Sequence, residues 1–178
     1  MVTNKFHLSQ NFGNQRSLRQ TGPVIKAQWR VTAETEEKLK VEHLHIPPPV
    51  RGFMVIDTSF VGTGIDAEVA QELNLEFVRE TKLQSVAGPL SQPTYLALLL
   101  IMLGNVDEEN LAIGGKTEAI SLPGLRVGYD TYGLTSPEGE QVRIIGVLGR
   151  DFLQFTRFTY DGLNGTWEME IDPSAMRL

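Results

Sequence analysis

Cysteine is absent from all 178 residues, which excludes disulfide bonds, thiolate metal sites and a cysteine nucleophile. Basic clusters are also missing, because no short stretch holds more cations than the two of Arg16 to Arg19, and the formal net charge is −6. A surface that binds nucleic acid needs clustered Lys and Arg to contact phosphates. We therefore expect no nucleic-acid partner.

Long hydrophobic runs are lacking as well. The longest extends from Tyr95 to Leu103 and has nine residues, whereas a membrane-spanning helix needs about 20. The N-terminal segment has no apolar stretch of the kind that a secretory signal requires. We expect a cytoplasmic protein without a membrane partner.

The composition that remains is that of an ordinary globular domain, with 41% hydrophobic and 21% charged residues. Residues 1–21 are polar and follow neither the period of a strand nor that of a helix. We predict a loosely ordered N-terminal arm over residues 1–21 and one domain over residues 22–178.

Two strands are predicted near the start of this domain. Apolar and polar residues alternate from Ile25 to Val31, as in a strand with one buried face. A second strand is predicted from Leu39 to Ile46, after a turn at Glu34 to Glu37. Pro47 to Pro49 end it, because proline cannot donate to a ladder.

A buried central strand is predicted from Phe53 to Ile56, where consecutive apolar residues lead into Asp57. Asp66 is suited to cap a short helix, because its side chain can accept the first free amides of the helix. The apolar residues of this helix fall on one face, and Asn74 closes it. These apolar residues are Val69, Ala70 and Leu73.

Hairpins are predicted in the second half of the chain. One has arms at Lys82 to Val86 and Thr94 to Leu103, with Ala87, Gly88 and Pro89 in its turn. Residues 105–141 contain several Gly and Pro pairs, so we expect short strands and long surface turns there. A terminal hairpin is predicted over residues 158–171. The whole domain is predicted to be mostly β, with one or two short helices.

Two motifs resemble those of a known family. Asp57-Thr58-Ser59 follows an apolar strand, and Thr63 and Ile65 follow at fixed spacing. About 90 residues later, Val147 to Leu153 reads Val-Leu-Gly-Arg-Asp-Phe-Leu. Together, in this order and with a glycine-containing hairpin between them, they resemble the motifs of the retropepsin-like aspartic proteases. The resemblance covers roughly residues 23–172.

The resemblance implies a closed β-barrel of the acid protease fold and an aspartic endopeptidase that acts as a homodimer. Its catalytic residue would be Asp57, with Thr58 and Ser59 beside it. Only one such motif exists, so the second Asp57 must come from a symmetry-related subunit. Two neighbouring carboxylates cannot both ionise cheaply and therefore share one proton. One carboxylate then acts as base on a water that attacks the carbonyl group of a peptide or protein substrate, and the other acts as acid and polarises that carbonyl group. The resemblance implies no cofactor.

The resemblance also implies roles for residues outside this triplet. Thr58 would bond to the active-site loop of the second subunit, and the hairpin tip would act as a flap that closes over the substrate. Arg150 and Asp151 would tie the C-terminal helix to the active-site loop. The implied substrate-binding residues are Phe60, Val61, Val86, Ala87, Gly88 and Leu148, and the implied structural residues are Thr63, Gly149, Arg150 and Asp151.

The sequence departs from the family pattern at Ser59 and Phe60, where the family has glycine and a small residue. Serine keeps the amide that can bond to the Asp57 carboxylate and adds a hydroxyl, whereas Phe60 would narrow or fill the cleft. An alternative is therefore a non-catalytic dimeric module that binds peptides. A third interpretation is an unrelated structural β-barrel, in which Asp57 only forms a turn at a strand end.

No metal site is predicted. His43 and His45 would share a face of the predicted second strand, but a third ligand cannot be identified, so we expect an exposed pair. Asp107 to Glu109 suit a solvated turn. Gly146 to Gly149 do not form a phosphate loop, because no Lys-Ser/Thr pair follows them.

Overall fold

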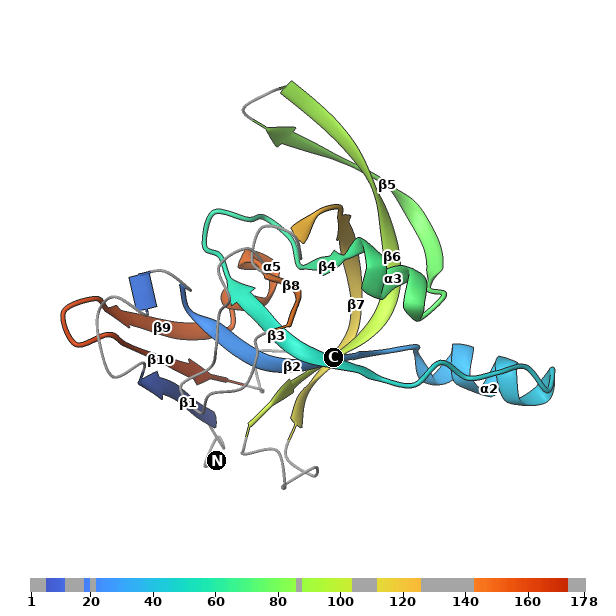
Figure 1. Ribbon diagram of the computed structural model, residues 1–178, viewed down its shortest axis with the longest axis horizontal. Helices are drawn as coiled ribbons and strands as arrows, with labels where there is room; N and C mark the ends of the chain where they lie inside the picture. Colours follow the sequence, from blue (N-terminus) through green and yellow to red (C-terminus); the bar gives the residue numbers. More distant parts are fainter. Residues whose placement is uncertain are drawn as a thin grey trace.

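Two β-sheets make up most of the protein in this computed structural model (Figure 1). One is a seven-stranded sheet and the other has three strands. The structure describes residues 6–11, 18–19, 22–85, 88–103, 112–125 and 143–172.

The seven-stranded sheet closes into a barrel. Its strand order is β2-β3-β8-β4-β7-β6-β5, and an additional pairing of β2 with β6 joins the ends of a six-stranded ring and leaves β5 outside it. This closed, mostly β architecture confirms the predicted fold class. The strands are β2 (Val24–Arg30), β3 (Val50–Ile56), β4 (Gly64–Asp66), β5 (Glu76–Ser85), β6 (Gly88–Met102), β7 (Ala112–Leu122) and β8 (Ile144–Leu148).

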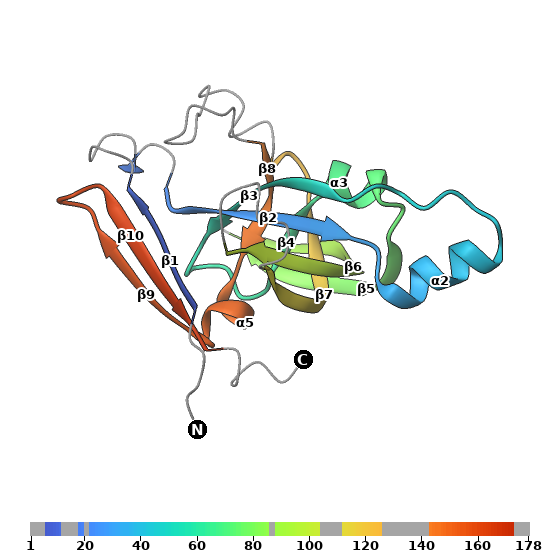
Figure 2. The same cartoon turned by 90° about the horizontal axis from the view of Figure 1, so that it is seen from below.

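The three-stranded sheet combines the two ends of the chain in the order β1-β10-β9, all antiparallel. Figure 2 shows it to one side of the barrel. The expectation of an irregular arm is wrong for Phe6–Asn11, which forms β1 and pairs with β10 along its whole length. The alternation of apolar Phe6 and Leu8 with polar His7 and Ser9 covers only four residues, and the partner of this strand is β10 (Thr166–Ile171), near the far end of the chain. Strand β9 is Thr156–Asp161.

The predicted second strand and the turn before it are wrong, because Ala33–Val41 forms helix α2. Thr32 caps it by accepting the amide of Thr35 at 3.3 Å, and its first turn is acidic and its last turn basic, as the helix dipole favours. The helix has no buried residue, so the sequence carries no helical stripe of apolar positions. Figure 1 shows α2 projecting from the barrel.

The two histidines follow this helix in an exposed segment that is not a strand. His43 has a left-handed backbone, with φ 54°, and ends the helix region. The shared strand face that a metal site would have needed is therefore missing at His43 and His45.

The predicted central strand is confirmed as β3, whose residues from Phe53 to Ile56 are all buried. The predicted capped helix is also confirmed as α3 (Ala67–Glu72). Asp66 accepts the amides of Glu68 and Val69 at 3.0 and 3.3 Å, and Asn74 leaves the helix with φ 46°. The apolar face that was predicted is buried, and comprises Val69, Ala70 and Leu73.

The predicted hairpin is confirmed as β5 and β6, which pair as far as Ser85 and Gly88. Its arms are longer than predicted, and Gly88 and Pro89, which were expected in the turn, belong to β6. Figure 1 shows it extending away from the barrel. The expectation of only short strands after residue 105 is wrong for β7, which has 11 residues. Gly114 indicated a turn but allows close strand pairing instead, because a Cβ there would lie 1.8 Å from the Leu99 carbonyl oxygen.

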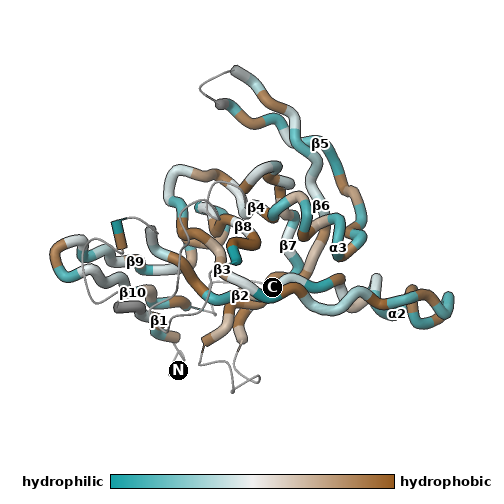
Figure 3. Tube along the Cα trace, in the orientation of Figure 1, coloured by the Kyte–Doolittle hydropathy of each residue, from teal (hydrophilic) through white to brown (hydrophobic). Residues whose placement is uncertain are grey.

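One contiguous core joins the barrel interior, α3 and the inner face of the small sheet. Figure 3 shows hydrophobic residues concentrated in the barrel strands, whereas α2 is largely polar. Trp29 is fully buried and its indole nitrogen donates to the Ile145 carbonyl at 3.2 Å, which satisfies its polar atom inside the core. Among the described residues, no helix has both the length and the hydrophobicity needed to cross a membrane.

The predicted terminal hairpin is confirmed as β9 and β10, and Asp161 organises its turn. One Asp161 oxygen accepts the amides of Leu163 and Asn164, both at 3.0 Å, and the other accepts the Asn164 side-chain amide at 2.6 Å. These hydrogen bonds, with the Asn164 side chain first, lower the pKa of Asp161.

Asp161→Asn is expected to make the protein less sensitive to acid below about pH 4. A lowered folded-state pKa means that the charged carboxylate stabilises the fold above its unfolded pKa, and that this stability is lost as the pH falls through the folded pKa. Urea denaturation at about pH 6 and pH 2.5 would measure the loss in each variant. Glu168→Gln on β10 is the control. The prediction would be contradicted if the loss of unfolding free energy between the two pH values were reduced equally in both variants.

Candidate functional site

Asp57 lies at the end of β3, at a point where the sheet order departs from the sequence order. β3 and β4 follow one another in the chain, but β8 lies between them, parallel to β3 and antiparallel to β4. The connection over residues 57–63 must therefore cross the end of β8. This crossing places Asp57 beside the start of helix α5 (Arg150–Leu153).

Backbone hydrogen bonds fix the crossing loop to the end of β8. The Asp57 amide donates to the Leu148 carbonyl at 3.1 Å. The amides of Arg150 and Asp151 donate back to the carbonyls of Phe60 and Val61, at 2.9 and 3.2 Å. The two sequence motifs, far apart in the chain, therefore form one hydrogen-bonded unit.

Gly149 stands where the two motifs come closest. A Cβ at this position would lie 1.9 Å from the Gly62 carbonyl oxygen and 3.0 Å from that of Phe60. Its φ of −95° is ordinary, so the glycine is required by space and not by backbone conformation. The structural role predicted for Gly149 has this steric basis.

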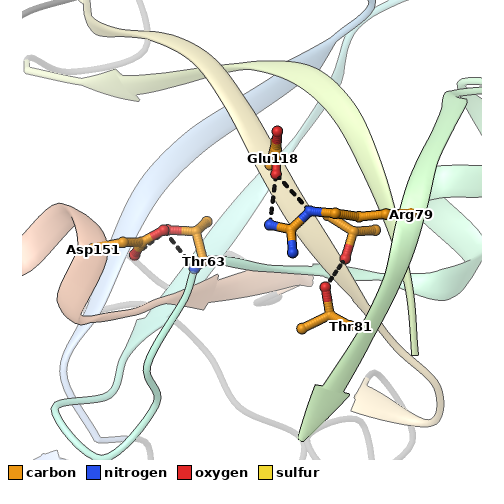
Figure 4. Close-up of polar contacts among 6 residues, drawn as sticks. Thr63, Arg79, Thr81, Glu118 and Asp151 are labelled. Atoms are coloured by element: carbon orange, nitrogen blue, oxygen red, sulfur yellow. Dashed lines mark hydrogen bonds and ion pairs between the residues drawn. The ribbon is translucent and has the colours of Figure 1, made fainter. Parts of the chain in front are cut away.

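The Asp151 carboxylate holds the loop from the other side (Figure 4). Thr63 donates its amide to one oxygen and its hydroxyl to the other, each at 2.8 Å, and the Phe152 amide also donates at 2.8 Å. Thr63 is only 1% exposed. Asp151 thus ties α5 to the loop as predicted, whereas Arg150 contributes through its backbone amide and has an exposed side chain.

Asp151→Ala is expected to lower the free energy of unfolding by about 2–3 kcal/mol, because the buried amide and hydroxyl of Thr63 lose their acceptor. Asp151→Asn, which keeps one acceptor oxygen, should lose about half as much. Urea denaturation would measure both variants. An alanine variant as stable as the wild type would show that this contact does not hold the loop.

The Asp57 carboxylate is half-buried and is held through one oxygen. Ser59 donates its amide at 2.8 Å and its hydroxyl at 2.6 Å, both to Oδ1. Oδ2 accepts no hydrogen bond from a described residue, and no described cation pairs with the carboxylate. The side chain is therefore oriented while one oxygen stays open to another partner.

The neighbours of Asp57 differ in where they point. Thr58 is exposed, and its hydroxyl has no partner within the described part of the chain. The Phe60 ring lies against the loop itself, with an edge carbon 3.3 Å from where a Gly64 Cβ would be. Phe60 is not in the wall of the adjacent cleft, so its packing here differs from the predicted substrate contact.

A cleft of about 760 Å³ opens beside the loop, under the β5–β6 hairpin and against β7 and α5. Its size is in the range of sites that hold small molecules or short peptide segments. Val61 and Thr63 contribute to it from the loop. The apolar part of its wall comprises Leu83, Leu99, Ile120, Phe152 and Phe155.

Polar side chains from the three neighbouring strands complete the wall (Figure 4). Arg79 on β5 donates from Nε and Nη2 to one oxygen of Glu118 on β7, at 3.1 and 2.7 Å, and so reaches across β6. The hydroxyls of Thr81 and Thr94 lie 2.6 Å apart. The hairpin is therefore fastened to the barrel sheet at the cleft.

The predicted substrate-binding residues are dispersed. Val61 lines the cleft, and Gly88 is the first residue of β6, with φ 115°. Val86 and Ala87 lie outside the described residues. The prediction for Leu148 is wrong, because this side chain is fully buried where β8 passes between two strands of the barrel.

Sequence reasoning missed the polar wall of the cleft. Arg79 and Thr81 alternate with Glu80 and Lys82, and this period was a readable signal of a shared strand face. Glu118 could not be found, because β7 was not expected as a long strand. In the described ranges, no group of three His, Cys, Asp or Glu side chains could hold a metal ion.

Comparisons with known proteins identify no family for the chain. No protein-family model matches it, and no curated protein matches it either. Inferences about function therefore rest on the geometry of the site and on the two motifs.

Proposed function

We propose that the protein is an aspartic endopeptidase that acts as a homodimer, in which each subunit supplies its Asp57 to one catalytic pair. The observation that carries the proposal is the placement of Asp57, half-buried in a loop fixed across the end of β8. Ser59 holds one carboxylate oxygen, and the other accepts no hydrogen bond from the residues that the structure describes. A positioned carboxylate with one free oxygen is what general acid–base catalysis requires.

Two copies of Asp57 brought together would share a proton, since both carboxylates cannot ionise cheaply at hydrogen-bond distance. The ionised carboxylate takes a proton from a bound water, and the neutral one donates its proton to the peptide carbonyl oxygen. Water adds to the carbonyl carbon, and collapse of this intermediate breaks the C–N bond after proton transfer to the amine. The second carboxylate must come from another chain, because the sequence contains one such motif.

The exposed Thr58 and the protruding hairpin support the same proposal. Thr58 has no partner in the described part of its own chain and stands next to Asp57, where a second subunit would approach. The β5–β6 hairpin covers the cleft beside the active-site loop and would close over a bound peptide.

The alternative is a dimeric peptide-binding module that has lost hydrolysis, and one observation favours it. The Ser59 hydroxyl stands 2.6 Å from Asp57 Oδ1, a position from which it competes with a catalytic water for that oxygen. In this case the protein still dimerises and binds peptides in the cleft, but the bound peptides dissociate without being cleaved.

The test is to incubate the purified full-length protein with a mixed peptide library between about pH 3 and 8 and to identify products by mass spectrometry. We expect cleavage, together with a dimer in sedimentation experiments. Binding of an active-site-directed peptide mimic without cleavage at any pH would favour the alternative. Neither cleavage nor binding would overturn both interpretations.

A further inference from the structure

The turn between β9 and β10 contains the one Asn-Gly pair in the sequence, Asn164-Gly165. Asn164 is exposed, and Gly165 has a left-handed backbone with φ 68°. Every other asparagine precedes a residue that has a side chain, as Asn74 precedes Leu75. The backbone nitrogen that follows an asparagine is therefore least shielded at Gly165.

An asparagine in this setting can lose its side-chain amide without an enzyme. The backbone nitrogen of the next residue gives up its proton and attacks the asparagine Cγ, which forms a succinimide ring and releases ammonia. Water then opens the ring at either of its carbonyl groups and leaves aspartate or isoaspartate. The net reaction takes up water and releases ammonia, so it needs no oxidant and no other reactant.

Two features of Gly165 favour this reaction. Its amide donates to no acceptor in the described part of the chain, so no hydrogen bond has to break before the nitrogen attacks. It also has no Cβ to hinder the new bond between this nitrogen and Cγ. Gly165 itself is buried, but the exposed Asn164 side chain gives water access to the ring.

Asp161 opposes the reaction, because it holds the Asn164 side chain. Asn164 donates its backbone amide to Oδ1 at 3.0 Å and its side-chain amide to Oδ2 at 2.6 Å. Closing the ring moves Cγ onto the Gly165 nitrogen and draws the side-chain amide away from Oδ2. A hydrogen bond to an ionised carboxylate is about twice as strong as one between neutral groups, so breaking it slows the reaction.

We propose that Asn164 is a site of spontaneous deamidation, in which the Gly165 nitrogen displaces the side-chain amide, and that Asp161 slows this step by holding that amide.

The product would weaken the turn. The Asn164 side chain is the first cause of the lowered pKa of Asp161, whereas a carboxylate at this position would raise that pKa. Asn164→Asp, which imitates the aspartate product, should therefore unfold at a lower urea concentration than the wild type at about pH 6. The difference should shrink at about pH 2.5, where both carboxyl groups are mostly neutral.

Peptide mapping tests the site on the full-length, folded wild type, stored at about 37 °C and at about pH 6 or pH 8. Trypsin cuts after Arg157 and Arg177, and the peptide over residues 158–177 contains Asn164 and no other amide side chain. A mass gain of about 1 Da in this peptide therefore reports on Asn164 alone. Fragmentation separates isoaspartate, which requires the ring, from aspartate, which direct hydrolysis also gives.

We expect isoaspartate to accumulate at position 164, and faster at the higher pH, because the attacking nitrogen must lose its proton. Asn74, which is also exposed and has a positive φ, should react at less than about one tenth of this rate, because Leu75 shields the nitrogen.

Asp161→Ala should speed the reaction at Asn164 about fivefold, because the side-chain amide loses its charged acceptor. Glu168→Gln on β10 removes a carboxylate outside the turn and should react at the wild-type rate. Circular dichroism checks that both variants are folded.

Three results would overturn the proposal. If the folded wild type gains no isoaspartate at position 164, the turn is not a deamidation site. Aspartate without isoaspartate would exclude attack by the Gly165 nitrogen. Equal rates in the wild type and Asp161→Ala would show that Asp161 does not restrain the reaction.

Discussion

Asp57→Asn is expected to reduce peptide cleavage by about 1,000-fold or more, because an amide can neither take a proton from water nor share one with its partner. The asparagine Oδ1 can still accept both hydrogen bonds from Ser59, so the loop should keep its conformation. Thermal unfolding and sedimentation should therefore match the wild type. Asp161→Asn in the terminal hairpin is the matched control and should cleave normally.

Mixing the wild type with Asp57→Asn tests whether the pair of carboxylates spans two subunits. If the subunits exchange freely at equal concentrations, only about one quarter of the dimers contain two wild-type chains. Cleavage activity should therefore fall to about one quarter of that of the wild type at the same total chain concentration. A fall to about one half would mean that each chain acts alone. That result, or normal cleavage by the variant, would contradict the proposed site.

Gly149→Ala is expected to be the most damaging single methyl addition in and around the loop that carries Asp57. The new Cβ would stand 1.9 Å from the backbone oxygen of Gly62, and a backbone carbonyl held in a loop cannot turn aside as a side chain can. We expect a loss of about 4 kcal/mol or more, enough to leave little folded protein. Circular dichroism and urea denaturation would measure it.

Gly162→Ala provides the control for this substitution. Gly162 lies in the β9–β10 turn without a positive φ, and the nearest atom to its new Cβ would be an edge of the Tyr160 ring at 3.1 Å. That ring is about half exposed and can shift, so we expect a change within about 1 kcal/mol. A Gly149→Ala variant as stable as this control would show that the two motifs do not approach as described.

Helix α2 shows how a local signal can be present and still be misread. Thr32 and the ion pair of Glu36 with Lys40, at 2.8 Å, both favour a helix, and both are visible in the sequence. The helix buries none of its side chains, so the apolar period that usually identifies a helix is missing. The pattern around Leu39 to Ile46 therefore predicts a strand, although the helix continues to Val41.

The sequence by itself determined those features whose causes lie within a few residues. The buried run that ends at Asp57, the Asp66 cap and the β9–β10 hairpin follow from local hydrophobicity, capping and turn chemistry. The two motifs were visible in the same way. The resemblance alone implied that Asp151 would tie α5 to the loop, and it did not name Thr63 as the residue that Asp151 binds.

Only the tertiary structure decided which strands became neighbours. The insertion of β8 between β3 and β4 buries Leu148, turns the loop across the end of β8 and makes glycine necessary at position 149. The pairing of β1 with β10 and the approach of Arg79 to Glu118 have the same origin. A strand's pattern records which of its faces is buried but not which strand lies beside it, because that choice depends on packing between distant parts of the chain.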